Sequence, residues 1–463
     1  MDTEDVGRGL QTAPTISTQH SAFSNSEAVD VGRLLNDARL RPFHQWVIFL
    51  TALTIIFDGV DNQLLGIVIP TLMREWGVPR TAFAPLVSLG YLGMMIGGAV
   101  AGVAGDRFGR RTALLGSMAV FGAMTLAAVT ATAPAQLGWL RLLAGIGLGG
   151  AMPNAAALVA EFVPLRQRPI AVTVTIVCVP LGATIAGLLG IRLLPVVGWR
   201  LLFLAGGVVP LAAAAILWRL LPESPRFLAR DRSRWPELVR LLARMGHPVG
   251  ERATFIDSTE RAVERASIRA VFGPDFRVDT IALWAAFFCC LLAVYSGFSW
   301  LTTLLSGAGF TPSTANTGIT AFNLGGVAGA LVGGIAIARV GSRISMLSMA
   351  AVAIMSALVL SRMSLSPAAD VVIITWLTVL GAMINGVQTT MYALAAHVYP
   401  GPVRATGVGT AVAFGRIGAV LSGYAGSWAI GFRGSASFFG LIATAMLATL
   451  IALAVVRRHV LAR

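Results

Sequence analysis

Two aspartates in a long apolar run are the residues whose type and spacing most directly suggest chemistry. Asp58 and Asp61 lie near the middle of the run 44–70, so a helix there would place them on one face. A carboxylate facing lipid costs roughly 2.5–3.5 kcal/mol, and both should therefore face a cavity or a partner. Desolvation and like charge favour one proton held between them. The pair is a candidate for proton coupling, and a structural ion pair that locks helices together is the alternative.

Two arginines also interrupt apolar runs, Arg141 in 136–160 and Arg416 in 404–427. Arginine stays charged, and its planar fork fits a carboxylate in bidentate geometry. We expect Arg141 to balance the aspartates and Arg416 to meet the carboxylate of an anionic substrate. The reverse assignment stays open.

A polar stripe in the run 369–395 is the third candidate. Asn385, Gln388 and Tyr392 follow helical spacing, so they would lie on one face, either lining a substrate cavity or bonding to neighbouring helices. The sequence shows no metal-ligand spacing, nucleophile elbow or phosphate loop. The glycines of 145–150 sit in an apolar run without a preceding strand and favour close helix packing. We therefore expect no catalytic residue, no metal and no cofactor, and the protein is not predicted to be an enzyme.

Composition indicates the elements that hold these residues. The chain of 463 residues is 56% hydrophobic and only 12% charged, whereas soluble domains are about a quarter charged. Apolar runs near the length of about 20 residues that crosses a bilayer recur between short polar breaks. These runs predict an all-α membrane protein with twelve transmembrane helices, at 44–70, 83–104, 112–131, 136–160, 169–190, 199–221, 278–304, 315–338, 344–363, 369–395, 404–427 and 435–456.

The helices divide into two related halves. The stretch 102–111 lines up with 334–343, and 157–168 lines up with 393–404, in the same order along the chain. Such repeats indicate two bundles packed about an axis along the membrane normal, with a solute site between them. The predicted division is a tail at 1–43, a six-helix bundle at 44–221, a central loop at 222–277, a six-helix bundle at 278–456 and a tail at 457–463.

Charge indicates the orientation. The net charge of +14 comes from arginines, most of which fall in the central loop, the tails and one set of short loops. Because basic residues concentrate on the cytoplasmic side, this pattern predicts cytoplasmic termini in a multi-pass inner-membrane protein rather than a nucleic-acid-binding one. No signal peptide is visible. A monomer is expected.

The loop at 102–111 resembles the signature of the major facilitator superfamily. Asp58 and Asp61 with the stretches 141–150, 221–226 and 399–418 resemble the aromatic acid:proton symporters within it. The resemblance implies the major facilitator fold. It also implies a gating role for Asp106, Arg107, Gly109, Arg110 and Arg111.

Glu161 and its repeat equivalent His397 are both titratable and end their predicted helices, and each precedes an arginine by seven positions, Arg168 in the first case. Ion pairs with loop arginines there could close the inner mouth in one state and break in the other. Simple anchoring of the loop is the alternative.

The combined expectation is a secondary active transporter that imports a small aromatic carboxylate of the benzoate, hydroxybenzoate or phenylpropionate type by proton symport with alternating access. Its partners are the aromatic acid, protons and the bilayer, and the proton gradient takes the place of a cofactor. The alternatives are a proton-coupled transporter of another small organic anion or sugar-like solute, a drug or metabolite exporter, and a sensor with a transporter fold. A glycine-proline pair typical of exporters is absent from 177–187.

Overall fold

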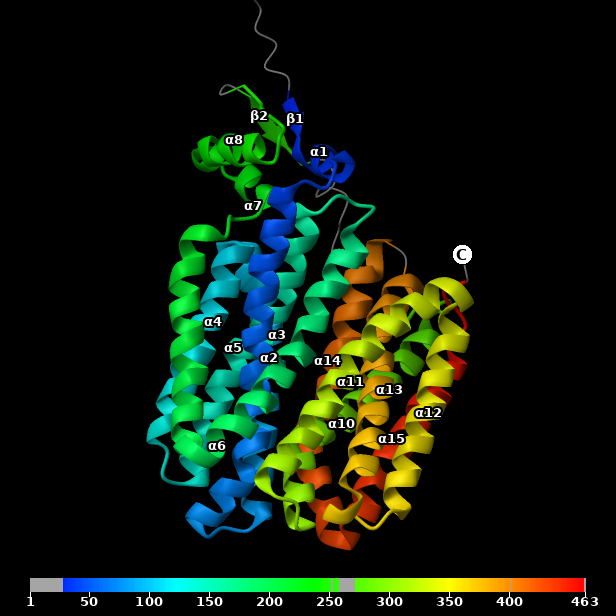
Figure 1. Ribbon diagram of the computed structural model, residues 1–463. Coiled ribbons are helices and arrows are strands. Elements are labelled where there is room, and N and C mark those ends of the chain that lie inside the picture. The colour runs from blue at the N-terminus through cyan, green and yellow to red at the C-terminus, as the bar shows by residue number, and fades with distance from the viewer. Residues whose placement is uncertain (1–27, 251–252, 258–270, 400, 462–463) are drawn as a thin grey trace, which may run out of the picture.

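Long helices running side by side make up nearly all of the computed structural model, which describes residues 28–250, 253–257, 271–399 and 401–461 (Figure 1). The predicted all-α architecture is confirmed. Predicted tail residues 1–27 lie outside the described residues. The long helices are α2 (Pro42–Trp76), α3 (Ala84–Phe108), α4 (Arg110–Ala127), α5 (Pro134–Phe162), α6 (Arg168–Leu220), α10 (Arg277–Gly307), α11 (Pro312–Val340), α12 (Ser342–Arg362), α13 (Asp370–Val398), α14 (Gly401–Arg433) and α15 (Ser435–Val455).

Eleven helices of the described residues are long and apolar enough to cross a membrane, and α6 contains two of the predicted spans. Its 53 residues would extend about 80 Å as one straight helix, far beyond a bilayer. At Gly198 the backbone leaves the helical region, with φ 74° and ψ 176°, a conformation open to glycine. Figure 1 shows the chain reversing its direction within α6. The eleven helices therefore make twelve crossings.

Both ends of the described chain lie at the same end of the bundle (Figure 1). We call it the tail end, and the opposite end, where α2 finishes at Trp76, the far end. Small elements cap the tail end: β1 (Ala28–Asp30), α1 (Val31–Asp37), α7 (Pro225–Arg230), α8 (Trp235–Arg244) and β2 (Thr254–Ile256). Strand β1 pairs in parallel with β2, so the predicted N-terminal tail is tied to the predicted central loop.

The long helices form two groups, α2 to α6 and α10 to α15. They meet where α6 packs on α11, α3 on α14 and α2 on α10. This arrangement follows the repeat in the sequence. The domain limits given above stay a prediction.

Glycines bring helix backbones into direct contact within each group. A Cβ atom on Gly149 of α5 would lie 2.1 Å from the carbonyl oxygen of Met94 on α3. In the second group a Cβ on Gly381 of α13 would lie 2.0 Å from the carbonyl oxygen of Phe322 on α11. These small residues provide the close packing that holds membrane helices together without a hydrophobic driving force.

We expect Gly149→Ala to destabilise the protein by about 1–3 kcal/mol, because the added methyl group would force α3 and α5 apart. The thermal midpoint of the detergent-solubilised protein measures this loss. Gly116→Ala on α4 is the matched control, since no atom of the described residues beyond the local helix backbone lies within 4 Å of the Cβ position there. Equal midpoints for the two variants would contradict the packing argument.

Candidate functional site

A central cavity lies where the two groups of helices meet. Its open space is about 50 Å³, far below the roughly 300–1,000 Å³ of ligand-filled pockets, so the site is contracted in this conformation. Seven helices contribute to its wall, α2, α3, α5, α6, α10, α13 and α14. The polar and aromatic lining residues are Asp58, Asn62, Tyr295, Phe298, Asn385, Gln388, Thr389, Tyr392 and Arg416.

The two predicted aspartates have different surroundings. Asp61 is fully buried and accepts hydrogen bonds from Arg141 at 3.2 and 3.4 Å. Thr125 of α4 donates to the same carboxylate and accepts from Arg141 at 2.6 Å. The guanidinium carbon of Arg141 also lies 5.3 Å from the ring centre of Phe203. The predicted balance of Arg141 against an aspartate is thus present as a buried ion pair with Asp61.

Asp58 lines the central cavity instead. It is 3% exposed, and its Oδ1 atom has no hydrogen-bond partner within the described residues. An ionised carboxylate without a partner is costly in such surroundings, whereas a protonated one is far less so. This position suits a group that takes up and releases a proton.

Arg416 faces the same cavity from α14. It is half-buried and makes no ion pair within the described part of the chain. Its guanidinium lies about 4 Å from the Cβ position of Gly98 on α3, so the side chain reaches the other group of helices. The arrangement leaves the planar donor fork free for an anion.

Three aromatic rings line the cavity, those of Tyr295, Phe298 and Tyr392, and other rings pack behind them. The rings of Tyr91 and Tyr295 lie 4.5 Å apart in an edge-to-face pair, and Phe298 lies 5.8 Å from Tyr295. Tyr392 of α13 packs edge-on against Phe287 at 5.4 Å. Such faces and edges suit a flat aromatic ligand.

The structure brings the predicted polar stripe into the cavity, since Asn385, Gln388 and Tyr392 all line it. Asn62 and Thr389 also line it but were not among the predicted site residues. Asn62 stands one helical turn after Asp58, a signal that could have identified it. Thr125, which completes the Asp61 ion pair, lies in an apolar helix where no sequence signal marks it.

The predicted gating residues lie at the tail end. Arg110 links Asp106 at 2.5 Å with Glu161 at 3.2 Å, and the hydroxyl of Ser224 donates to Glu161. Gly109, with φ 99°, turns the chain from α3 into α4. The result is a network that ties α3, α4 and α5 to the segment after α6.

Glu223 completes this network by accepting from the backbone N–H of Arg111 at 3.0 Å. A carboxylate there stabilises the N-terminus of α4. Glu223 and Ser224 lie within the stretch 221–226 but had no predicted role.

The remaining gating candidates have other partners. Arg107 stacks on Phe108, and Arg111 stacks on Trp218 and donates to its carbonyl. Arg168 donates to Asn36 of the tail segment at 2.9 Å rather than to Glu161. His397 is exposed, and no ion pair involves it within the described residues. The two repeat copies therefore differ at this end of the bundle.

The second group closes its tail end with the chain after α15. Asp279, buried at the start of α10, accepts from the backbone N–H of Arg457 at 2.7 Å. His459 and Ser342 hydrogen-bond at 3.0 Å, and the backbone N–H of Ser342 donates to the carbonyl of Val460 at 2.9 Å. Burial lowers the pKa of His459, so its neutral ring can accept the proton of the Ser342 hydroxyl.

The family description "Major Facilitator Superfamily" matches residues 51–373, which include the aspartates, the Asp61 ion pair and the tail-end network. The chain belongs to the major facilitator superfamily. It is therefore a member of a transporter superfamily and not an enzyme, as predicted.

Relatives within the superfamily are transporters named for aromatic acids. The chain is 35% identical to a gallate transporter of Pseudomonas putida over 83% of this chain and 85% of that one. It is 35% identical to the 4-hydroxybenzoate transporter PcaK of Acinetobacter baylyi, over 87% and 89% of the two chains. A 3-(3-hydroxy-phenyl)propionate transporter of Escherichia coli is 33% identical over 80% and 83%. The predicted resemblance to aromatic acid transporters is confirmed.

Solved structures confirm the predicted fold. The inward-open xylose transporter XylE from E. coli superimposes with a TM-score of 0.71 at 15% identity, over 90% of this chain and 97% of that one. A crystal structure of a D-xylose-proton symporter gives 0.68 at 16% identity, over 89% and 98%. At these identities the likeness concerns the architecture alone.

We expect Arg141→Gln to destabilise the protein by about 3–5 kcal/mol, because it leaves the Asp61 carboxylate buried and unpaired. The double variant Arg141→Gln/Asp61→Asn removes both charges and should recover most of that loss. Thermal midpoints in detergent measure both. A double variant as unstable as the sum of its single variants would show that the pair is not coupled.

Proposed function

We propose that this protein is a secondary active transporter that imports a small aromatic carboxylate by proton symport with alternating access. The observation that carries the proposal is the half-buried Arg416, without an ion-pair partner within the described residues, in a cavity that also holds aromatic rings and Asp58. The names of the relatives support the substrate class, which spans benzoate, hydroxybenzoate and phenylpropionate types.

Different residues would recognise the carboxylate of the substrate and its aromatic ring. The Arg416 fork offers two parallel donors to a carboxylate, and Tyr295 and Tyr392 offer aromatic contacts. The amides of Asn385 and Gln388 can hydrogen-bond to ring hydroxyls. We assign substrate binding to Arg416 and to the polar stripe, and a supporting role to Arg141, which its ion pair with Asp61 holds away from the substrate.

Proton coupling would follow from the number of charges in the cavity. A substrate carboxylate beside Arg416 adds a second negative charge to a small space that already holds Asp58. A proton on Asp58 removes that repulsion, so proton and substrate bind more tightly together than apart, and linkage makes this effect reciprocal. Asp61 is the second member of the coupling pair, because a proton that reached it would weaken the ion pair with Arg141.

The tail end would be the cytoplasmic side. Arginines concentrate in the segment 226–244 at this end, in agreement with the positive-inside pattern. We therefore propose a protein of the inner membrane with both termini in the cytoplasm and bundles at 44–221 and 278–456. The ion pairs of Arg110 with Asp106 and Glu161 would break and reform as the inner mouth opens and closes.

Vesicles containing the purified protein test the proposed function. We expect labelled benzoate, 4-hydroxybenzoate or 3-phenylpropionate to accumulate only with an inward proton gradient, and a protonophore to abolish accumulation. Empty vesicles are the control. Failure of all three acids to enter would refute the proposal and favour another solute. Accumulation only when the proton gradient is directed outward would refute it and favour export.

We expect Asp58→Asn to abolish gradient-driven accumulation while exchange of labelled for unlabelled substrate continues, because the amide cannot carry the proton. Accumulation at the wild-type level would show that Asp58 is not the coupling group.

Arg416→Lys keeps the positive charge but loses the bidentate fork, so we expect substrate affinity to fall by about tenfold or more, equivalent to about 1.4 kcal/mol. Titration of the purified protein with substrate measures this change. An affinity equal to that of the wild type would place the substrate carboxylate elsewhere.

A further inference from the structure

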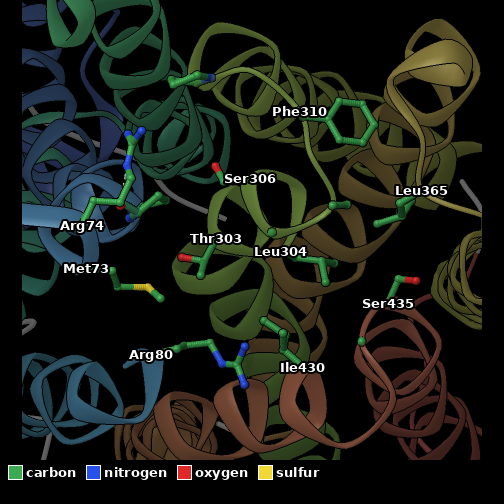
Figure 2. Close-up of a pocket in the computed structure, with 15 residues that line it drawn as sticks. Met73, Arg74, Arg80, Thr303, Leu304, Ser306, Phe310, Leu365, Ile430 and Ser435 are labelled. Atoms are coloured by element: carbon green, nitrogen blue, oxygen red, sulfur yellow. Dashed lines mark hydrogen bonds between the residues drawn. The ribbon is translucent and has the colours of Figure 1, made fainter. Parts of the chain in front are cut away.

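A second and larger cavity lies at the far end, where the central cavity does not reach. Its open space is about 620 Å³, and it is lined by the ends of α2, α10 and α14 and by the turn before α3 (Figure 2). Figure 2 shows Arg80 extending toward Ile430, so a cation of the first group meets a helix of the second. We call this space the far-end cavity.

The far-end cavity continues the line of the central one along two helices. On α10, Tyr295 lines the central cavity, and Thr303, eight residues later, lines the far-end cavity. On α2, Asn62 lines the central cavity, and Pro70, also eight residues later, lines the far-end cavity. Because steps of four residues stay near one helix face, the two cavities lie on one path.

A barrier of hydrogen bonds separates the two cavities. Gln63 donates to the carbonyl of Phe298 at 2.9 Å and accepts from Asn323 at 3.1 Å. The hydroxyls of Tyr91 and Ser299 share a hydrogen bond of 2.7 Å. Ser299 lies one turn from Tyr295 and one turn from Thr303, so the barrier crosses α10 midway between the cavities. The path is therefore closed toward the far end while the far-end cavity stays accessible from that side.

The far-end cavity is positively charged. Arg74 and Arg80 line it, and no carboxylate lines it among the described residues. The carboxylate of Glu75, adjacent to Arg74 in the sequence, accepts hydrogen bonds from Trp199 at 2.6 Å and Arg200 at 2.7 Å. The cations therefore face the cavity without neutralisation by a lining acid.

Polar groups in the far-end cavity also lack partners. The Nε atom of Arg80 and the hydroxyl of Thr303 are buried and make no hydrogen bond within the described residues. A Cβ on Gly431 would lie 2.9 Å from the guanidinium of Arg80, so the absence of a side chain there makes room for it. Met73 and Phe310 supply apolar surface beside these groups. An anion with an apolar ring matches this combination of free donors, positive charge and apolar wall.

We infer that the far-end cavity is a capture site, which binds the aromatic carboxylate from outside before the hydrogen-bonded barrier opens. This inference rests on the proposed function for its ligand class and direction. Arg80, at the boundary of the two groups, holds the carboxylate, and Arg74 at the rim attracts it. Like-signed charge in a cleft raises the local concentration of an oppositely charged ligand and its association rate by 10-fold or more.

Transport at low ionic strength tests the capture site. We expect Arg80→Gln and Arg74→Gln to raise the KM for uptake about tenfold together, with little change in maximal rate, and the difference to shrink as salt screens the charges. Arg433→Gln removes the same charge from an exposed residue of the far end outside the cavity and is the matched control. A KM for Arg80→Gln equal to that of the control would overturn the inference.

Direct binding provides a readout that a structural role of Arg80 would not produce. In an Arg416→Gln protein, which lacks the central carboxylate site, saturation-transfer NMR should still detect weak binding of 4-hydroxybenzoate ring protons. Adding Arg80→Gln should abolish that signal, while adding Arg433→Gln should leave it. Absence of the signal in Arg416→Gln alone, while the wild type binds and transports, would refute the capture site and leave the proposed function intact. Absence of uptake and binding in the wild type would instead refute the proposed function.

A lipid phosphate could occupy the same cations. The uptake experiment is therefore run in vesicles of phosphatidylcholine alone and with phosphatidylglycerol added. An effect of Arg80→Gln in both supports substrate capture. An effect only with the anionic lipid would assign the site to a lipid headgroup and overturn the inference.

Discussion

The buried ion pair between Asp61 and Arg141 fixes how the first group of helices meets the central cavity. Separating the two side chains would leave each charge buried without a partner, so the pair sets the rotation of α2 against α5. At about 100° per residue, Asp58 points about 60° away from Asp61 and Asn62 about 40° to the other side of Asp58. One helix can therefore present Asp61 to its own group and Asp58 to the space between the groups.

The two groups of helices pack through glycines in the same way, but they cap the helix N-termini at the tail end differently. Glycines bring α3 against α5 and α11 against α13 in the same way, because lipid gives helices no hydrophobic reason to associate. At the tail end, the N-terminal N–H groups of a helix need acceptors. Glu223 accepts from the start of α4, whereas the carbonyl of Val460 accepts from the start of α12. In the second group Ala338 stands in place of Asp106 and Ser342 in place of Arg110, so the ion pair of the first group has no equivalent at these two positions.

Hydropathy and the internal repeat were sufficient to predict the fold, because the bilayer imposes helix length and duplication imposes the two groups. Asp58, Arg416 and the polar stripe of α13 all line the central cavity, and the sequence singles them out because polar residues are conspicuous in apolar helices. Their roles stay predictions. The contacts between helices could not be predicted from the sequence. Thr125 is unremarkable in sequence, and only the packing of α4 against α2 shows that it completes the Asp61 ion pair. Likewise, α6 looked like two separate spans, and only its backbone shows that a glycine turn joins them.

The barrier between the cavities must be strong enough to separate them and weak enough to open in each cycle. A hydrogen bond contributes about 0.5–1.5 kcal/mol net, so bonds such as those of Gln63 with Phe298 and Asn323 amount to a few kcal/mol. Carbonyl and hydroxyl groups freed by opening would meet water entering from the far-end cavity, which reduces the cost further. A substrate anion held at that cavity would then lie one helical turn beyond Ser299, beside the path that the opening creates. The polar barrier and the charged cavity next to it are thus two parts of one arrangement, which closes the path and keeps the ligand at its mouth.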